Sequence, residues 1–160
     1  MEHSPEELIN GNKIFRRLNA YWNGLARAVD GMPDAGSFEL DMLGPILPYL
    51  AVTEYDRAAD RFRFVYLGRT LQDRFRCRVD DGYLDESHSE EIRSDFQDHL
   101  RSVFETKFPV VRAADMKNPN ERFCHYECFT LPVANDKSGK SLLLTAVTYA
   151  PCRQAVRRAA

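Results

Sequence analysis

The chain has 160 residues, of which 44% are hydrophobic and 11% aromatic, and its net charge is −2. This is enough apolar material to build the core of one domain. The near-neutral charge excludes an overall field that would attract nucleic acid or an anionic membrane, and the apolar runs are far shorter than the ~20 residues that cross a bilayer. The beginning of the chain is acidic and polar rather than apolar, unlike an export signal, so we expect a cytoplasmic protein whose four cysteines are reduced.

Residues 5–29 have the spacing of an amphipathic helix. Its apolar residues recur every three or four positions, with a gap at Gly11, at Leu8, Phe15, Leu18, Trp22, Leu25 and Val29. Two interpretations are open, because such a helix packs equally well on its own domain or on a second copy of itself. Glycines and a proline in 30–37 predict a linker, and the two prolines of 43–50 predict a packed connector rather than a regular helix.

Two strands are predicted next, at 50–56 and 61–67, and their short connection indicates an antiparallel hairpin. Strict alternation in the second strand would place Phe62, Phe64 and Tyr66 on one face. Gly68 ends this strand and a short helix follows it. A phosphate-binding loop at Gly68 is excluded, because such loops need several glycines and a lysine.

A long amphipathic helix is predicted at 88–106. One apolar stripe runs through Ile92, Phe96, His99 or Leu100, and Val103. Three further strands are predicted at 109–115, 122–133 and 141–150, with turn-rich connections. The last ten residues, 151–160, form a tail with three arginines, which we expect to be solvated.

No metal site is predicted. Cys124 and Cys128 would share a face of a strand but lie about 13 Å apart, too far to bind one zinc ion. The sequence also has no motif of the known hydrolases. His99 borders the apolar stripe of the long helix, where a histidine is usually a packed residue and less often a ligand of haem.

Several strings in order resemble a PAS domain, and in particular a group of small bacterial single-domain PAS proteins. The matching strings are Tyr21–Trp22, Leu47–Tyr49, Phe62–Leu71, Tyr83–Glu86, and a late hairpin with Leu131–Val133, Gly139, Leu142 and Leu143. The resemblance departs at Arg76, where a glycine is usual, and at Gly82, where the later glycine is displaced.

The resemblance implies an α+β fold with a five-stranded antiparallel sheet, helices over one face and an N-terminal helix extension. We therefore divide the chain into an N-terminal helix and linker (1–36), a PAS-like domain (37–150) and the basic tail (151–160). In such domains the space between sheet and helices holds a ligand or is filled by side chains. The residues that we expect to line this space are Phe62, Phe64, Tyr66, Phe96, His99 and Phe129.

The resemblance implies a non-catalytic sensory module of bacterial signal transduction, which binds a small apolar or amphipathic molecule or contacts a partner protein. We expect no cofactor, since Cys77 and Arg78 match the flavin-binding branch but Arg76 and Asp81 replace its amide side chains. A ligand would shift the population between two packings of the sheet and the N-terminal helix, and that helix would form a homodimer. The alternatives are a haem or flavin sensor and a small isomerase or dehydratase that uses His99 with Asp95 or Asp98.

Overall fold

The computed structural model describes residues 3–87, 89, 91–117, 123–134 and 141–149, without the side chains of 115–117 and 123–124. The strands are β1 (Leu50–Asp56), β2 (Arg61–Leu67), β3 (Val110–Lys117), β4 (Phe123–Val133) and β5 (Ser141–Tyr149). They form one sheet in the order β2-β1-β5-β4-β3, and each neighbouring pair is antiparallel. The expected α+β fold with a five-stranded antiparallel sheet is therefore confirmed. The basic tail, 151–160, lies outside the described residues.

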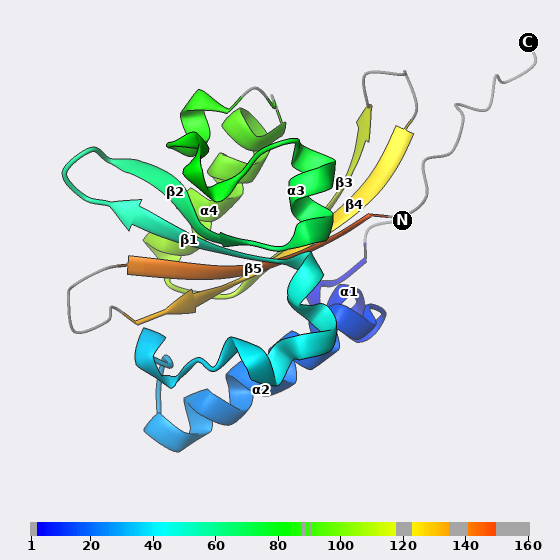
Figure 1. The fold of residues 1–160 in the computed structure, drawn as a ribbon. Helices are drawn as coiled ribbons and strands as arrows, with labels where there is room; N and C mark the ends of the chain where they lie inside the picture. The colour runs from blue at the N-terminus through cyan, green and yellow to red at the C-terminus, as the bar shows by residue number, and fades with distance from the viewer. Residues whose placement is uncertain (1–2, 88, 90, 118–122, 135–140, 150–160) are drawn as a thin grey trace, which may run out of the picture.

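Helices cover both faces of the sheet (Figure 1). On one side lie α3 (Arg69–Phe75) and a π-helical turn, η5 (Ile92–Phe96), that continues into α4 (Gln97–Thr106). On the other side lie α1 (Pro5–Asn10) and α2 (Lys13–Val29), together with the 3-10 connector η2 (Leu40–Tyr49). Shorter 3-10 turns are η1 (Ala35–Ser37), η3 (Val79–Asp81) and η4 (Leu84–Glu86).

The helix-side core lies between the sheet and α3, η5 and α4. We use this name for the buried cluster Ala51, Phe62, Phe64, Leu67, Leu71, Phe75, Cys77, Leu84, Ile92, Phe96, Leu100, Val103, Tyr126, Cys128, Leu143 and Val147. The predicted stripe is confirmed, because Ile92, Phe96, Leu100 and Val103 all belong to this cluster. His99 is buried as well, next to Leu100.

The α2-side core lies on the opposite face of the sheet. It contains Phe15, Leu18, Leu43, Ile46, Leu50, Phe129, Leu131, Val133, Leu144 and Ala146. Phe15 and Leu18 are fully buried, and the ring centroids of Phe15 and Phe129 are 5.6 Å apart. The apolar stripe of α2 therefore packs on its own domain, which is the first of the two interpretations that the sequence allowed.

Strict alternation fails within β2, so the expectation that Tyr66 shares a face with Phe62 and Phe64 is wrong. The pairing with β1 shifts by one residue, from Thr53 opposite Phe64 to Val52 opposite Tyr66. The extra residue, Val65, is a β-bulge, and a bulge moves every later side chain to the other face. Tyr66 consequently packs against the α2-side core, and its hydroxyl donates to the Leu47 carbonyl oxygen at 3.1 Å.

Gly68 forms the predicted corner between β2 and α3, for a reason that concerns space rather than torsion angles. Its φ of −61° is open to any residue. A Cβ atom at this position, however, would lie 2.4 Å from the carbonyl oxygens of both Leu47 and Pro48. The glycine thus lets β2 and the connector η2 touch, and its N–H donates to the Leu50 carbonyl oxygen at 2.8 Å.

Candidate functional site

Aromatic rings occupy much of the space between the sheet and the helices. The ring centroids of Phe64 and Phe96 are 6.0 Å apart, and those of Phe75 and Phe96 are 5.8 Å apart. Phe62 meets Phe104 edge to face at 6.1 Å. These separations are typical of packed aromatic clusters, so large side chains fill this part of the helix-side core.

The residues proposed to line a cavity are divided between the two faces. Phe62, Phe64, Phe96 and His99 lie on the helix side. Tyr66 lies on the α2 side because of the bulge. Phe129 lies there because side chains alternate along β4, and Tyr126 and Cys128 belong to the helix-side core. The structure therefore does not bring these two rings to the space between sheet and helices.

His99 belongs to a buried hydrogen-bonded chain. Its Nε2 lies 2.8 Å from Thr130 Oγ1, which lies 2.7 Å from Thr145 Oγ1 on the neighbouring strand. Burial, with a smaller contribution from the charge of Arg112, lowers the pKa of His99 to about 4. The imidazole is therefore neutral at pH 7 and acts as a structural link between α4 and the sheet.

The same geometry bears on the haem and enzyme alternatives. The Nε2 atom of His99 is already bound to a hydroxyl, whereas a haem ligand needs this nitrogen for iron. Of the two aspartates considered as its partners, Asp98 is exposed and Asp95 lies 3.9 Å from Arg112. His99 is therefore hydrogen-bonded to a threonine inside the core, and neither aspartate is placed as the carboxylate partner that the enzyme alternative requires.

A second polar cluster, which the sequence did not predict, lies at one end of the helix-side core. The Tyr149 hydroxyl donates to Glu91 Oε1 at 2.8 Å, and the guanidinium carbon of Arg74 lies 4.5 Å from the centre of the Tyr149 ring. The rings of Phe75 and Tyr126 complete the surroundings, with centroids 6.3 and 6.1 Å from that of Tyr149. We call Arg74, Glu91 and Tyr149 the Tyr149 cluster.

Burial dominates the electrostatics of this cluster. It raises the pKa of Glu91 above its usual value, against the lowering effects of the Tyr149 hydrogen bond and the charge of Arg74. Burial also raises the pKa of Tyr149, and that of Tyr126 to about 12. The two tyrosines therefore remain hydroxyl donors throughout the physiological pH range.

Two cysteines of the helix-side core are free thiols. Burial, aided by the charge of Asp81, raises the pKa of Cys77 to about 11, and burial raises that of Cys128 to about 12. Both are therefore protonated and poorly nucleophilic at pH 7. Within the described ranges, no three histidine, cysteine or acidic side chains come together as metal ligands.

On the opposite face of the same hairpin, the start of α2 is attached to the sheet by Asn12. Its Oδ1 accepts the backbone N–H groups of Ile14 and Phe15, so it caps the helix. Its Nδ2 donates to Thr148 Oγ1 at 2.8 Å and to Glu127 Oε2 at 3.1 Å. Further along α2, Trp22 Nε1 donates to the Pro132 carbonyl oxygen at 3.0 Å.

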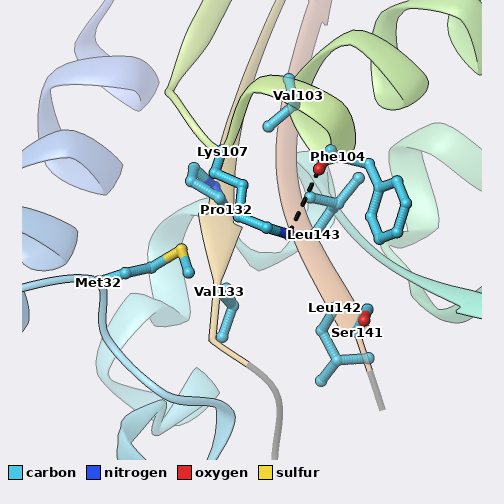
Figure 2. Close-up of a pocket in the computed structure, with 9 residues that line it drawn as sticks. All are labelled: Met32, Val103, Phe104, Lys107, Pro132, Val133, Ser141, Leu142 and Leu143. Atoms are coloured by element: carbon cyan, nitrogen blue, oxygen red, sulfur yellow. Dashed lines mark hydrogen bonds between the residues drawn. The ribbon is translucent and has the colours of Figure 1, made fainter. Parts of the chain in front are cut away.

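A small pocket lies at the other end of the β4–β5 pair, around Val133 and Leu142 (Figure 2). It has room for about 20 Å³, which is the space of one water molecule rather than of an organic ligand. The side chains around it come from the linker, α4, β4 and β5, and Lys107 Nζ donates to the Phe104 carbonyl oxygen at 3.4 Å. Its lining residues are Met32, Val103, Phe104, Lys107, Pro132, Val133, Ser141, Leu142 and Leu143.

Solved structures with a similar arrangement include LOV domains. A fungal LOV domain photoreceptor aligns with 73% of this chain and 79% of its own, at 14% identity and a TM-score of 0.45. A variant of RsLOV aligns over 71% and 68% of the two chains, at 9% identity and a TM-score of 0.44. An RNA-binding light-oxygen-voltage receptor aligns over 72% and 35%, at 13% identity and a TM-score of 0.42.

No curated protein sequence is similar enough to the chain to count as a relative. Of the helices that the structure describes, none has the length and apolar character of a membrane span. The family comparison is decisive, because the sequence model of the PAS domain matches residues 12–148 and so includes α2 and all of the sheet except its last residue, Tyr149. The chain therefore belongs to the PAS domain family.

Proposed function

We propose that this PAS domain is a non-catalytic sensory module that relays the packing state of the helix-side core to the N-terminal helix α2 and from there to a partner protein. A small apolar or amphipathic molecule that enters the core would set this state. The observation that carries the proposal is the register of the β4–β5 hairpin, which joins the two sides.

The register places contacts of both cores on adjacent residue pairs. Tyr126 pairs with Tyr149, and the next pair is Glu127 with Thr148. The tyrosine pair faces the helices, and the Glu127–Thr148 pair holds Asn12 at the start of α2. Since successive side chains of a strand point to opposite faces, a shift of the tyrosine pair also moves the attachment of α2.

The relay needs no large movement. A molecule that binds one of two packings more tightly shifts the population toward it by its differential affinity. The attachment of α2 near Asn12 combines the burial of Phe15 with a few hydrogen bonds, each worth about 1 kcal/mol, so a modest binding energy would act on these hydrogen bonds rather than release the whole helix.

The test is hydrogen–deuterium exchange on α1 and α2 in the Tyr149→Phe variant. The variant loses the hydrogen bond to Glu91 on the helix side, and we expect roughly fivefold faster exchange at the start of α2, as follows from about 1 kcal/mol. Tyr83→Phe is the matched control, because it also removes a tyrosine–carboxylate bond, to Asp56 at 2.5 Å, but far along the sheet from this hairpin end. Equal exchange of α2 in the two variants would contradict the proposal.

We also propose that a second copy of the chain contacts the C-terminal end of α2. Phe15 and Leu18 are used within the domain, whereas Val29 is 49% exposed and Leu25 is half-buried. A Val29→Asp variant should sediment as a monomer at concentrations where the unmodified chain is a dimer. A monomeric unmodified chain at micromolar concentration would remove this part of the proposal.

A further inference from the structure

The carboxylate of Glu91 occupies an unusual position at one end of the helix-side core. It accepts a hydrogen bond from Tyr149 in a half-buried, largely aromatic environment, and it has no ion-pair partner within 4 Å among the described residues. Loss of hydration is unfavourable for a carboxylate unless strong contacts replace the water. The hydrogen bond from Tyr149 and the nearby charge of Arg74 offset this loss only in part.

Arg74 is the complementary group. Its guanidinium is half-buried and stacks on the Tyr149 ring at 4.5 Å, and no described carboxylate pairs with it. Arg112, the other cation near this end, is already engaged by Asp95, through the carbonyl oxygen at 3.5 Å and the carboxylate at 3.9 Å. Arg74 thus offers guanidinium donors that no described carboxylate uses, next to a hydroxyl donor that Glu91 uses.

Together these groups have the composition of a site for an organic acid. Tyr149 O–H and the Arg74 guanidinium supply donors for a carboxylate, which prefers charge-assisted hydrogen bonds. Phe75 and Tyr126 supply an apolar aromatic wall within about 6 Å of the Tyr149 ring. Small-molecule sites commonly combine such an apolar wall with a few polar groups that fix orientation.

We propose that Glu91 is an internal substitute for the carboxylate of a small aromatic or apolar carboxylic acid, which binds Arg74 and Tyr149 when the Glu91 side chain turns out to solvent. This rests on the proposed sensory function and names the chemical class of its ligand. The exchange is favourable because Glu91 regains its hydration, while the incoming acid gains a contact with the Arg74 guanidinium and packs its apolar part against the aromatic rings around Tyr149.

The test uses benzoate as the probe and benzamide as its uncharged counterpart, with binding followed by calorimetry and by NMR shifts at residues 74 and 149. Glu91→Ala removes the internal competitor, so we expect benzoate to bind it at least about tenfold more tightly than it binds the unmodified protein, a difference of about 1.4 kcal/mol. Benzamide should bind neither protein measurably. Asp98→Ala removes an exposed carboxylate of the same helical segment and should leave benzoate binding unchanged.

The role of Arg74 is tested in the Glu91→Ala background. Arg74→Gln should lower benzoate affinity at least about tenfold, because a hydrogen bond to a charged group is worth about 1.5–3 kcal/mol. Arg69→Gln removes an exposed arginine of the same helix, α3, and should have no effect. If Glu91→Ala does not fold, Glu91→Gln replaces it, with a smaller gain in affinity because the neutral amide still competes for Tyr149.

Three outcomes would overturn the site: no benzoate binding to any folded Glu91 variant, equal binding of benzamide, or NMR shifts confined to other residues. The outcomes also separate the two proposals. Benzoate binding at the Tyr149 cluster without any change in α2 exchange retains the site and contradicts the relay. Faster α2 exchange in Tyr149→Phe without benzoate binding retains the relay and removes the site.

Discussion

Gly68 shows how one missing side chain permits a whole corner of the fold. The carbonyl oxygens of Leu47 and Pro48 lie where its Cβ would be. Backbone atoms cannot move aside as flexible side chains can, so an added methyl group must push β2 away from the connector η2.

We therefore expect Gly68→Ala to lower the free energy of unfolding by about 2–3 kcal/mol, as overpacking in a close contact typically does. Gly24→Ala is the matched control, because Gly24 lies in α2 with no atom within 4 Å of its would-be Cβ. That substitution should stabilise the chain by about 0.5–1 kcal/mol through the lower flexibility of the unfolded state. Urea unfolding measures both changes, and equal midpoints for the two variants would contradict the steric argument.

The neutral state of His99 makes stability depend on pH in a defined window. Its pKa falls from 6.5 to about 4 on folding, so the unfolded chain binds more protons than the folded one between these values. The contribution of His99 to the free energy of unfolding is therefore fully present above pH 6.5 and decreases as the pH falls toward 4, by roughly 3 kcal/mol in total.

We expect urea unfolding between pH 7 and pH 4.5 to show this loss, and His99→Leu to abolish most of it. His125→Gln is the control, because this histidine has a half-exposed side chain. A pH dependence that survives in His99→Leu would show that other groups cause it. The aspartates with lowered pKa values, Asp56, Asp60 and Asp85, contribute only at lower pH.

Among single residues, the sequence predicts burial better than the face on which a side chain lies. His99 and Phe96 are buried as their helical spacing suggested. Tyr66 and Phe129 lie on the α2 side of the sheet instead of the helix side. The face of Tyr66 depends on the β-bulge and that of Phe129 on how β4 is aligned in the sheet, and neither can be recognised in the local sequence. Glu91 was missed because a glutamate before an apolar stripe normally faces water, and its hydrogen-bond partner, Tyr149, lies 58 residues away in the sequence.

At the scale of elements, α2 behaves as a component of the core rather than as an appendage. Its fully buried residues, Phe15 and Leu18, face Phe129, Leu131 and other apolar side chains of β4 and β5. The three-and-four spacing predicted an amphipathic helix at this place, but the same pattern also fits a coiled coil. The choice between a helix packed on its own domain and a coiled coil depends on the apolar face that β4 and β5 present to α2, which is known only from the structure.

Phe15→Ala should therefore cost about 3–5 kcal/mol, the usual range for a phenylalanine removed from a packed core. Arg16→Ala changes the adjacent exposed residue and should stay within about 0.5 kcal/mol of the unmodified chain. Chemical unfolding of both variants gives the comparison. Similar small effects would mean that α2 leaves the sheet easily in solution.

At the scale of the molecule, the order of helices and strands could be predicted because each element carries its own periodicity. The strand order β2-β1-β5-β4-β3 was not predicted, because local patterns do not show which strands pair across the sheet. The predicted boundary after residue 36 crosses the α2-side core, because this core includes residues from both parts of the chain, such as Phe15 and Leu144.

We expect a fragment of residues 37–150 to lose cooperative unfolding, since it would expose the apolar face formed by Phe129, Leu131 and Leu144. The readouts are near-ultraviolet circular dichroism and binding of a hydrophobic dye. The full chain is the control. A fragment with sharp unfolding and no dye binding would show that the PAS sheet folds without α2.

The bulge at Val65 has a consequence for how one end of the sheet is held. Beyond it, Tyr66 is tied to the Leu47 carbonyl, and Gly68 lies against the same connector, so this corner is fixed by contacts on both sides. Tyr149 and Thr148 lie at the same end of the sheet, just past the Leu50–Ala146 pair, where the pairing of β5 with β4 is supplemented by side-chain hydrogen bonds to Glu91 and Asn12. One end of the sheet is therefore joined to η2 through backbone contacts at β2 and to the start of α2 through side chains at β4 and β5.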